Sequence, residues 1–298
     1  MEYTTLGKSD LRISRIAFGC MSLGSDQQQI ETILQAAIDG GVNFFDTADL
    51  YDKGLNEERV GAALKPKRKD VIIASKVGNQ WRPDGSGWDW NPSKAYILAC
   101  ADKSLQRLQT DYIDLYQLHG GTMEDPMDET IEAFELLKQQ GKIRWYGISS
   151  IRPNVIREYV KRSNIVSVMM QYSLLDRRPE ESCFDLLQQH NIGVLARGSV
   201  AGGLLVNKPA KPYLNYSAEE VQKAADAMAA LSSSQRSAAQ TAMKFVLHHP
   251  ALSAAVVGIR TIAQLKDALA AMKANDLTTE ELNLLASRIP ANYYEQHR

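Results

Sequence analysis

The feature that most constrains the fold of this chain is an alternation of short apolar runs with amphipathic helical stretches, repeated eight times. The expected strands cover residues 16–19, 42–46, 71–76, 113–118, 143–148, 166–170, 192–196 and 254–257. The expected helices cover residues 29–40, 57–64, 92–108, 127–140, 153–161, 179–189, 235–247 and 261–273. Neighbouring parallel strands need a crossover, usually a helix, so this alternation predicts a parallel sheet. Eight such strands close a barrel, and the predicted fold class is therefore α/β, a (β/α)8 TIM barrel.

The chain is expected to form a single barrel domain over residues 1–298, because no linker or change in composition divides it. Residues 1–13, with a Gly-Lys-Ser-Asp turn, predict a short N-terminal β-hairpin that could close one end of the barrel. The serine run at residues 232–234 is too short for a linker and is expected to lie just before a helix, as its N-cap region.

The rival architecture is an open, doubly wound sheet that binds a dinucleotide at its first turn. That turn would need the pattern G-x-G-x-x-G between the first strand and the first helix. Residues 19–24 read Gly-Cys-Met-Ser-Leu-Gly, which has a different glycine spacing. The unbroken eightfold period therefore favours the barrel.

Charge and composition exclude several classes of function. The 34 basic and 35 acidic residues give a net charge of -1, and the basic residues are scattered, so we expect no nucleic-acid partner. The N-terminus lacks the pattern of a signal peptide and no apolar run is long enough for a membrane span, so we expect a cytoplasmic protein without a membrane partner. Three distant cysteines without a CxxC pair predict reduced thiols and no metal site. A monomer is the default oligomeric state.

Polar side chains follow the second, third and fourth expected strands at the same end. Asp46 ends the second strand and Tyr51 lies five residues on, Lys76 ends the third strand, and His119 follows the fourth. Each residue alone has a structural interpretation, as a helix cap, a loop aromatic, a solvated strand end or a core histidine. In a parallel barrel, however, all four would converge on one cavity at the C-terminal ends of the strands, where barrel enzymes keep their active sites.

Other polar residues in the same segments are alternative candidates. Asp114 and Tyr116 precede His119 at alternating positions, and the sequence leaves open whether they point outward or into the barrel. Asp49 and Asp52 flank Tyr51 and are expected to be loop or capping groups.

Taken together, these segments resemble the aldo-keto reductase superfamily, most closely its bacterial and potassium-channel-subunit branch. The resemblance covers nearly the whole chain. Its motifs are Tyr3-Thr4-Thr5-Leu6-Gly7 with Gly19, Phe45-Asp46-Thr47-Ala48 with Tyr51, Ser75-Lys76, Asp111-Tyr112-Ile113-Asp114-Leu115 with His119, Gly141-Lys142-Ile143-Arg144 with Gly147, Gln171-Tyr172, and Gly258 with Arg260.

The resemblance implies an NADPH-dependent enzyme that reduces aldehydes or ketones, with Asp46, Tyr51, Lys76 and His119 as a catalytic tetrad. Tyr51 would donate the proton, assisted by a charged Lys76 that Asp46 holds in place, and His119 would donate to the carbonyl oxygen. The partner is a small-molecule carbonyl substrate. The same branch also suggests an alternative, an NADPH-binding regulatory or sensor subunit that turns over slowly.

The resemblance also places the cofactor across the mouth of the barrel, mainly on loops that follow the fifth to eighth strands, with Met21 after the first. Arginine and lysine side chains there could pair with phosphate groups, and glycines would let the backbone approach the ligand. Ser150, Arg197 and Ala268 depart from the residues that the family usually carries at these positions. The expected cofactor-binding residues are Met21, Ser149, Ser150, Gln171, Arg197, Ser199, Gly203, Leu204, Lys208, Gly258, Arg260 and Gln264.

The segment from Gly78 to Asn91, after the third strand, is expected to be a long loop. It contains Trp81, Trp88 and Trp90, which are candidates for the wall of the substrate pocket. Packing of the loop onto the barrel explains these tryptophans equally well, because a surface tryptophan usually needs a partner.

Overall fold

The computed structural model describes residues 1–298, and its centre is a closed barrel of eight parallel strands. The barrel strands are β3 (Ile16–Gly19), β4 (Phe44–Asp46), β5 (Ile72–Val77), β8 (Ile113–Leu118), β9 (Ile143–Ser149), β10 (Ser167–Gln171), β11 (Gly193–Arg197) and β12 (Leu252–Gly258). They follow one another around the barrel in chain order, and β12 closes the ring by pairing with β3. The predicted (β/α)8 TIM barrel is confirmed.

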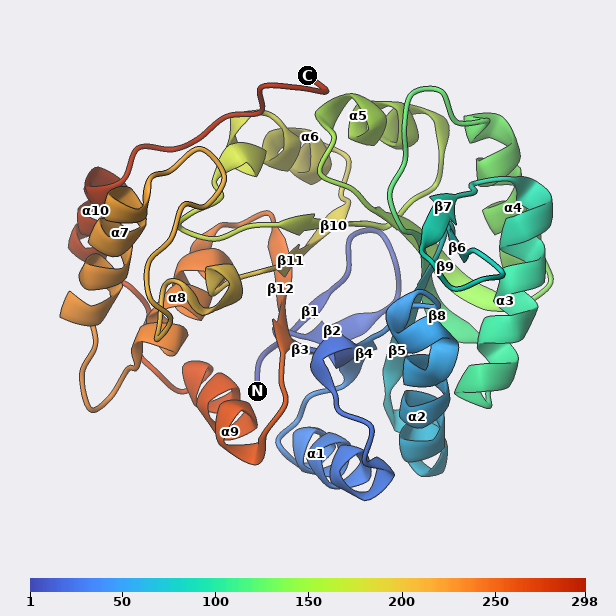
Figure 1. Ribbon diagram of the computed structural model, residues 1–298, viewed down its shortest axis with the longest axis horizontal. Coiled ribbons are helices and arrows are strands. Elements are labelled where there is room, and N and C mark those ends of the chain that lie inside the picture. Colours follow the sequence, from blue (N-terminus) through green and yellow to red (C-terminus); the bar gives the residue numbers. More distant parts are fainter.

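A ring of helices surrounds the barrel (Figure 1). One helix follows each strand in the predicted places: α1 (Gln27–Asp39), α2 (Leu55–Leu64), α3 (Lys94–Leu108), α4 (Met127–Gln139), α5 (Pro153–Arg162), α6 (Cys183–Gln189), α8 (Ala238–His248) and α9 (Ile262–Ala271). None of the helices is long and apolar enough to cross a membrane.

Two helices were not predicted, α7 (Ala218–Ala230) and α10 (Thr279–Arg288), which lie side by side at the left of Figure 1. Helix α7 buries only Val221, Ala224, Ala227 and Met228, and two of these four are alanines, so the helix has only a weak hydrophobic periodicity. In α10 only Leu285 is fully buried. Both helices begin with a capping box, in which the N-cap hydroxyl and the glutamate three residues on bond each other's backbone N–H groups.

The N-terminal hairpin closes one end of the barrel, as expected. Strands β1 (Tyr3–Thr5) and β2 (Arg12–Ser14) pair antiparallel, and Leu6, Leu11 and Ile13 are fully buried. These three side chains belong to a small core inside the barrel, which also contains Phe44, Ala74 and Leu115. A larger core of 68 residues fills the space between the barrel and the helices, so the strands are apolar on both faces.

Residues 78–91, expected to be a loop, instead form a second hairpin. Strands β6 (Asn79–Trp81) and β7 (Trp88–Trp90) pair antiparallel, with Trp81 opposite Trp88. The hairpin does not join the barrel sheet. Strands this short give little periodicity, which is why the sequence did not reveal them.

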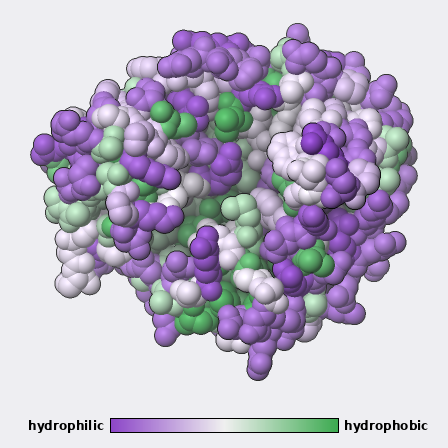
Figure 2. Space-filling model, in the orientation of Figure 1, coloured by the Kyte–Doolittle hydropathy of each residue, from purple (hydrophilic) through white to green (hydrophobic).

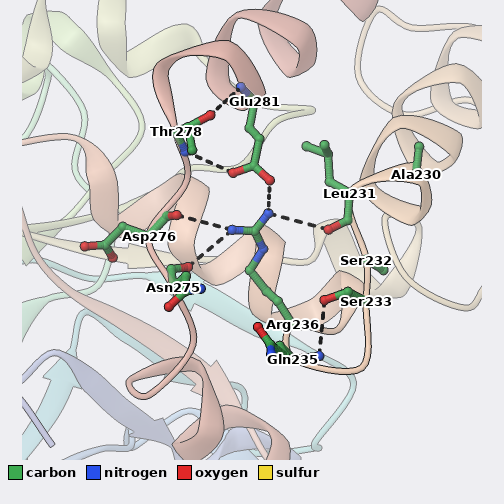
Figure 3. A pocket seen from close by; sticks show the side chains of 10 residues that line it. All are labelled: Ala230, Leu231, Ser232, Ser233, Gln235, Arg236, Asn275, Asp276, Thr278 and Glu281. Carbon is green, nitrogen blue, oxygen red and sulfur yellow. Dashed lines mark hydrogen bonds and ion pairs between the residues drawn. The ribbon is translucent and has the colours of Figure 1, made fainter.

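A buried arginine joins the turn between α7 and α8 to the segment between α9 and α10 (Figure 3). The Arg236 guanidinium donates to the carbonyl oxygens of Asn275 and Asp276, both at 3.3 Å, and forms an ion pair with Glu281. Glu281 also caps α10 by accepting from the backbone N–H of Thr278 at 2.9 Å. The turn that contains the serine run is thus held by Arg236, and the N-cap of α8 is Ser237, beyond that run.

Candidate active site

The structure brings Asp46, Tyr51, Lys76 and His119 together at the C-terminal end of the barrel. Side chains alternate along each strand, and Phe44, Ala74 and Leu115 belong to the core inside the barrel. Asp46, Lys76 and His119 stand an even number of residues further along β4, β5 and β8, so they face the same interior at its open end. Tyr51 begins the short turn that follows β4.

Lys76 is the centre of this group. Its Nζ donates to Asp46 Oδ2 at 2.7 Å, to the carbonyl oxygen of Thr47 at 2.7 Å and to the Tyr51 hydroxyl at 3.3 Å. These contacts use all three donors of the ammonium group. Only 1% of the Lys76 side chain is exposed, so the three partners hold it in one orientation.

Electrostatics keep Lys76 charged despite its burial. Loss of hydration alone would lower the pKa of the lysine, but the Asp46 carboxylate and the Tyr51 oxygen outweigh that effect and the pKa of Lys76 is raised. Burial also raises the pKa of Asp46, and the neighbouring ammonium opposes that rise. The two groups therefore depend on each other for their charged forms.

His119 is neutral at physiological pH. Burial first, and then the positive charges of Lys76 and Arg197, lower the pKa of the imidazole to about 3. The ring lies edge-on to the Tyr51 ring, with the centroids 6.0 Å apart and an interplanar angle of 82°. A neutral imidazole beside the phenol can donate or accept one hydrogen bond without adding charge to the site.

The alternative candidates on β8 point away from the site. Asp114 Oδ2 accepts from Arg68 and Oδ1 accepts from Arg144, each at 2.8 Å. Tyr116 is fully buried and packs against Phe134 of α4 in the outer core. Both residues therefore have structural roles, Asp114 in ion pairs and Tyr116 in packing.

Asp49 lies in the turn after β4, as expected for a loop group, but its carboxyl is buried near Lys76 and Glu57 of α2. Burial raises its pKa to about 8, assisted by the nearby Glu57 and opposed by Arg107 and Lys76. The folded pKa lies above that of an unfolded aspartate, about 3.9, so the folded state keeps a proton that the unfolded state loses. The contribution of Asp49 to stability is therefore fully present below about pH 4 and declines as the pH rises to about 8.

We expect Asp49→Asn to remove this pH-dependent loss, because asparagine carries no charge to bury. At pH 8 the variant should melt at a higher temperature than the wild type, which corresponds to a gain of about 1–3 kcal/mol in the free energy of unfolding. At pH 4 its melting temperature should change little. Thermal unfolding at both pH values measures the effect. The exposed Asp70→Asn provides a control, and an equal effect of Asp49→Asn at both pH values would contradict the assignment.

The expected cofactor residues on β10 and β11 contact one another. Gln171 Oε1 accepts from Arg197 at 3.0 Å, and Gln171 Nε2 donates to the Tyr213 hydroxyl at 2.6 Å. Ser199 follows Arg197 by two residues, and its Oγ is buried without a hydrogen-bond partner. Arg197 lies close enough to His119 that its charge helps to lower the pKa of the imidazole.

The glycine-rich segment after β11 has a defined backbone. Gly203 has a φ of 99°, and a Cβ placed there would lie 3.2 Å from the side chain of Lys208, which folds over it. The side chain of Leu204 is buried in the outer core, so Leu204 presents only its backbone to a ligand.

The segment after β12 leads into α9. Gly258 ends β12, and the backbone N–H of Arg260 donates to Gln264 Oε1 at 2.9 Å. The Arg260 side chain is exposed and forms no salt bridge. Thr261 caps the helix, so Arg260 stands free at the positive end of α9.

The remaining expected residues differ in their surroundings. Ser150 Oγ accepts from the backbone N–H of Arg152 at 3.2 Å but does not cap α5, whose N-cap is Arg152. Ser149 faces the barrel interior at the end of β9. Met21 is 64% exposed in the turn after β3.

Figure 2 shows apolar residues gathered in a hollow on the face of the molecule that it presents, surrounded by hydrophilic residues.

The three tryptophans have different positions. Trp90 Nε1 donates to Asp125 at 2.8 Å, and its ring lies against Gly78 and Gly120, so it packs the hairpin onto the barrel. Trp81 Nε1 donates to the carbonyl oxygen of Leu50, next to Tyr51, at 3.2 Å. Trp88 is half exposed at the hairpin.

Two residues near the mouth were missed in the sequence. Tyr213 belongs to a turn far along the chain from Gln171, and Asp125 lies in the loop after β8. Neither carried a local signal, because each is brought to the mouth by the path of a long loop.

Comparisons with known proteins identify the family to which this barrel belongs. A closed parallel barrel with a buried lysine between a carboxylate and a tyrosine at its C-terminal end has the features of a barrel enzyme. The chain belongs to the aldo/keto reductase family, since the sequence model of that family matches residues 15–289. The protein is therefore an oxidoreductase of a family that acts on small carbonyl compounds.

Similar proteins come from two Bacillus species. The uncharacterized oxidoreductase YqkF of Bacillus subtilis is 52% identical over the whole of both chains. The holo form of the aldo-keto reductase AKR11C1 from Bacillus halodurans is 51% identical and covers 100% of this chain and 99% of its own, with a TM-score of 0.94. Its apo form covers the same shares at 49% identity, with a TM-score of 0.87.

Proposed function

We propose that this protein reduces aldehydes or ketones to alcohols with NADPH, and that Tyr51 gives the proton to the carbonyl oxygen. The Lys76 ammonium gives the main support for this proposal, because it contacts both the Tyr51 hydroxyl and the Asp46 carboxylate. A cation beside a phenol favours the phenolate that remains after the proton has left. The tyrosine can therefore act as a general acid.

The other residues of the site have distinct tasks. Asp46 holds the lysine charged and in place. The neutral His119 donates a hydrogen bond to the carbonyl oxygen and orients the substrate, without competing with Tyr51 as an acid. As negative charge develops on that oxygen, Lys76 and His119 stabilise it electrostatically. When bound, a reduced nicotinamide supplies the hydride.

The residues around the mouth fit a dinucleotide cofactor. The buried, unpartnered hydroxyl of Ser199 offers a hydrogen bond, and Gln171 with Arg197 presents polar groups beside His119. The loops after the seventh and eighth barrel strands are the usual place for phosphate in this fold. They carry Lys208 and Arg260, and the free guanidinium of Arg260 favours NADPH over NADH, since it can pair with the additional phosphate.

A panel of aldehydes and ketones, tested with NADPH and NADH, is the experiment for this proposal. Oxidation of NADPH that depends on the carbonyl compound would support it, and the panel would indicate the substrate class. Tight binding of NADPH without turnover of any carbonyl would instead support the alternative, a slow regulatory or sensor subunit.

Arg260→Ala is expected to weaken NADPH binding and leave NADH binding nearly unchanged. Loss of a charge-assisted contact with phosphate should raise the Kd for NADPH by about 10-fold to 100-fold. Titration of each cofactor by protein fluorescence measures both constants. Arg157→Ala, at an exposed site on α5, is the control, and an equal loss of NADPH and NADH affinity in Arg260→Ala would exclude this phosphate contact.

A further inference from the structure

Gln117 is a buried polar residue that the proposed chemistry does not use. It lies on β8 between Leu115, part of the core inside the barrel, and His119, so all three face the interior. Its side chain is fully buried, but neither Oε1 nor Nε2 has a hydrogen-bond partner within the protein. Buried carboxamides are almost always hydrogen-bonded, because burial removes their hydrogen bonds to water and this costs free energy unless other partners replace them.

A second unsatisfied polar group lies two strands away. Ser167, at the start of β10, is fully buried, and its Oγ has no partner. Between the two residues lies Gly147 of β9, which pairs with Gln117. A Cβ on Gly147 would lie 2.5 Å from Ser167 Oγ, so only glycine leaves room for that hydroxyl. The Ser167 hydroxyl therefore packs directly against the backbone of Gly147, and the interior is polar at this point.

The third unsatisfied polar group belongs to the active site. His119 Nδ1 is buried without a partner, whereas Nε2 is not among the buried unpartnered atoms. A neutral imidazole carries its proton on one nitrogen, and the hydrogen bond made by the other nitrogen decides which one. To donate from Nε2 to a carbonyl oxygen, His119 needs a donor facing Nδ1.

We propose that Gln117, Ser167 and His119 Nδ1 share ordered water inside the barrel, and that this water donates to Nδ1 and keeps the imidazole proton on Nε2. Water suits the site because it is compact, donates and accepts, and needs two to four polar partners. Gln117 is thus a positioning residue that acts through His119. The catalytic consequence rests on the proposed function, but the water site itself does not.

The test compares the wild-type protein with the variant Gln117→Met. This substitution removes the amide and keeps a side chain of similar length. In a high-resolution crystal structure of the wild type, we expect water within hydrogen-bond distance of both His119 Nδ1 and the Gln117 amide. The ¹⁵N NMR signals of His119 should show a proton on Nε2 alone. In Gln117→Met, the two tautomers should mix and kcat should fall by about 10-fold, with the Kd for the cofactor unchanged.

Gln139→Met, the same change at an exposed position on α4, should leave the tautomer and kcat as in the wild type. A wild-type structure without such water, or a His119 proton on Nδ1, would overturn the proposal even if Gln117→Met does not fold. An unchanged His119 signal in a folded Gln117→Met would also overturn it. If no carbonyl is reduced at all, the proposed function fails, while the water and the tautomer still decide this inference.

Discussion

Tyr51→Phe is expected to lower kcat for carbonyl reduction by about 10²-fold to 10⁴-fold, the usual contribution of a general acid. The substitution removes only the hydroxyl that lies 3.3 Å from Lys76 Nζ, so the ring can keep its packing beside His119. The Kd for NADPH should stay close to that of the wild type. Steady-state oxidation of NADPH and a separate binding titration distinguish the two effects.

The matched control is Tyr293→Phe, which makes the same change at a tyrosine that is 60% exposed near the C-terminus. It should retain wild-type turnover. Turnover at the wild-type rate in Tyr51→Phe would show that another group delivers the proton and would contradict the proposed mechanism.

Lys76→Met should affect both activity and stability. Without the ammonium, Tyr51 loses the charge that favours its phenolate, and turnover should fall as far as in Tyr51→Phe. The Asp46 carboxylate, 2.7 Å from Nζ, would then be buried without a partner, which should lower the free energy of unfolding by about 3–5 kcal/mol. Urea unfolding and the NADPH assay measure the two consequences.

The double variant Asp46→Asn, Lys76→Met separates these effects. Asparagine leaves no unpaired charge, so most of the lost stability should return. Activity should stay low, because the ammonium is still missing. If the double variant is as unstable as Lys76→Met, the two residues do not depend on each other in the folded protein.

The sequence revealed most of the barrel because its strands and helices differ in apolar period. Strand β8 was predicted with its observed limits, and the positions of Asp46, Lys76 and His119 at strand ends were enough to predict that they meet. The limits of the prediction lie where periodicity is weak. Helix α7 buries alanines, and the strands of the tryptophan hairpin are three residues long.

Parts of the site depend on contacts that no local pattern encodes. The orientation of Asp114 was ambiguous until its two arginine partners were seen. The burial of Asp49 was not predicted, because its neighbours Glu57 and Arg107 belong to α2 and α3. Gln117 reads as an ordinary strand residue in the sequence. Only the barrel shows that Gln117 pairs with a glycine and that its amide is buried without a partner.

The pairing of β3 with β12 has a consequence for synthesis of the chain. Ile16 pairs with Ala255 and Gly19 with Gly258, so the first barrel strand meets its second neighbour only after the other seven barrel strands have been synthesised. Until residue 258 has left the ribosome, β3 and β11 remain open sheet edges, which can pair with other chains. Contacts so distant in sequence also slow folding. A nascent chain that has formed the earlier strands would be an unclosed sheet, and exposed strand edges of this kind are prone to aggregation.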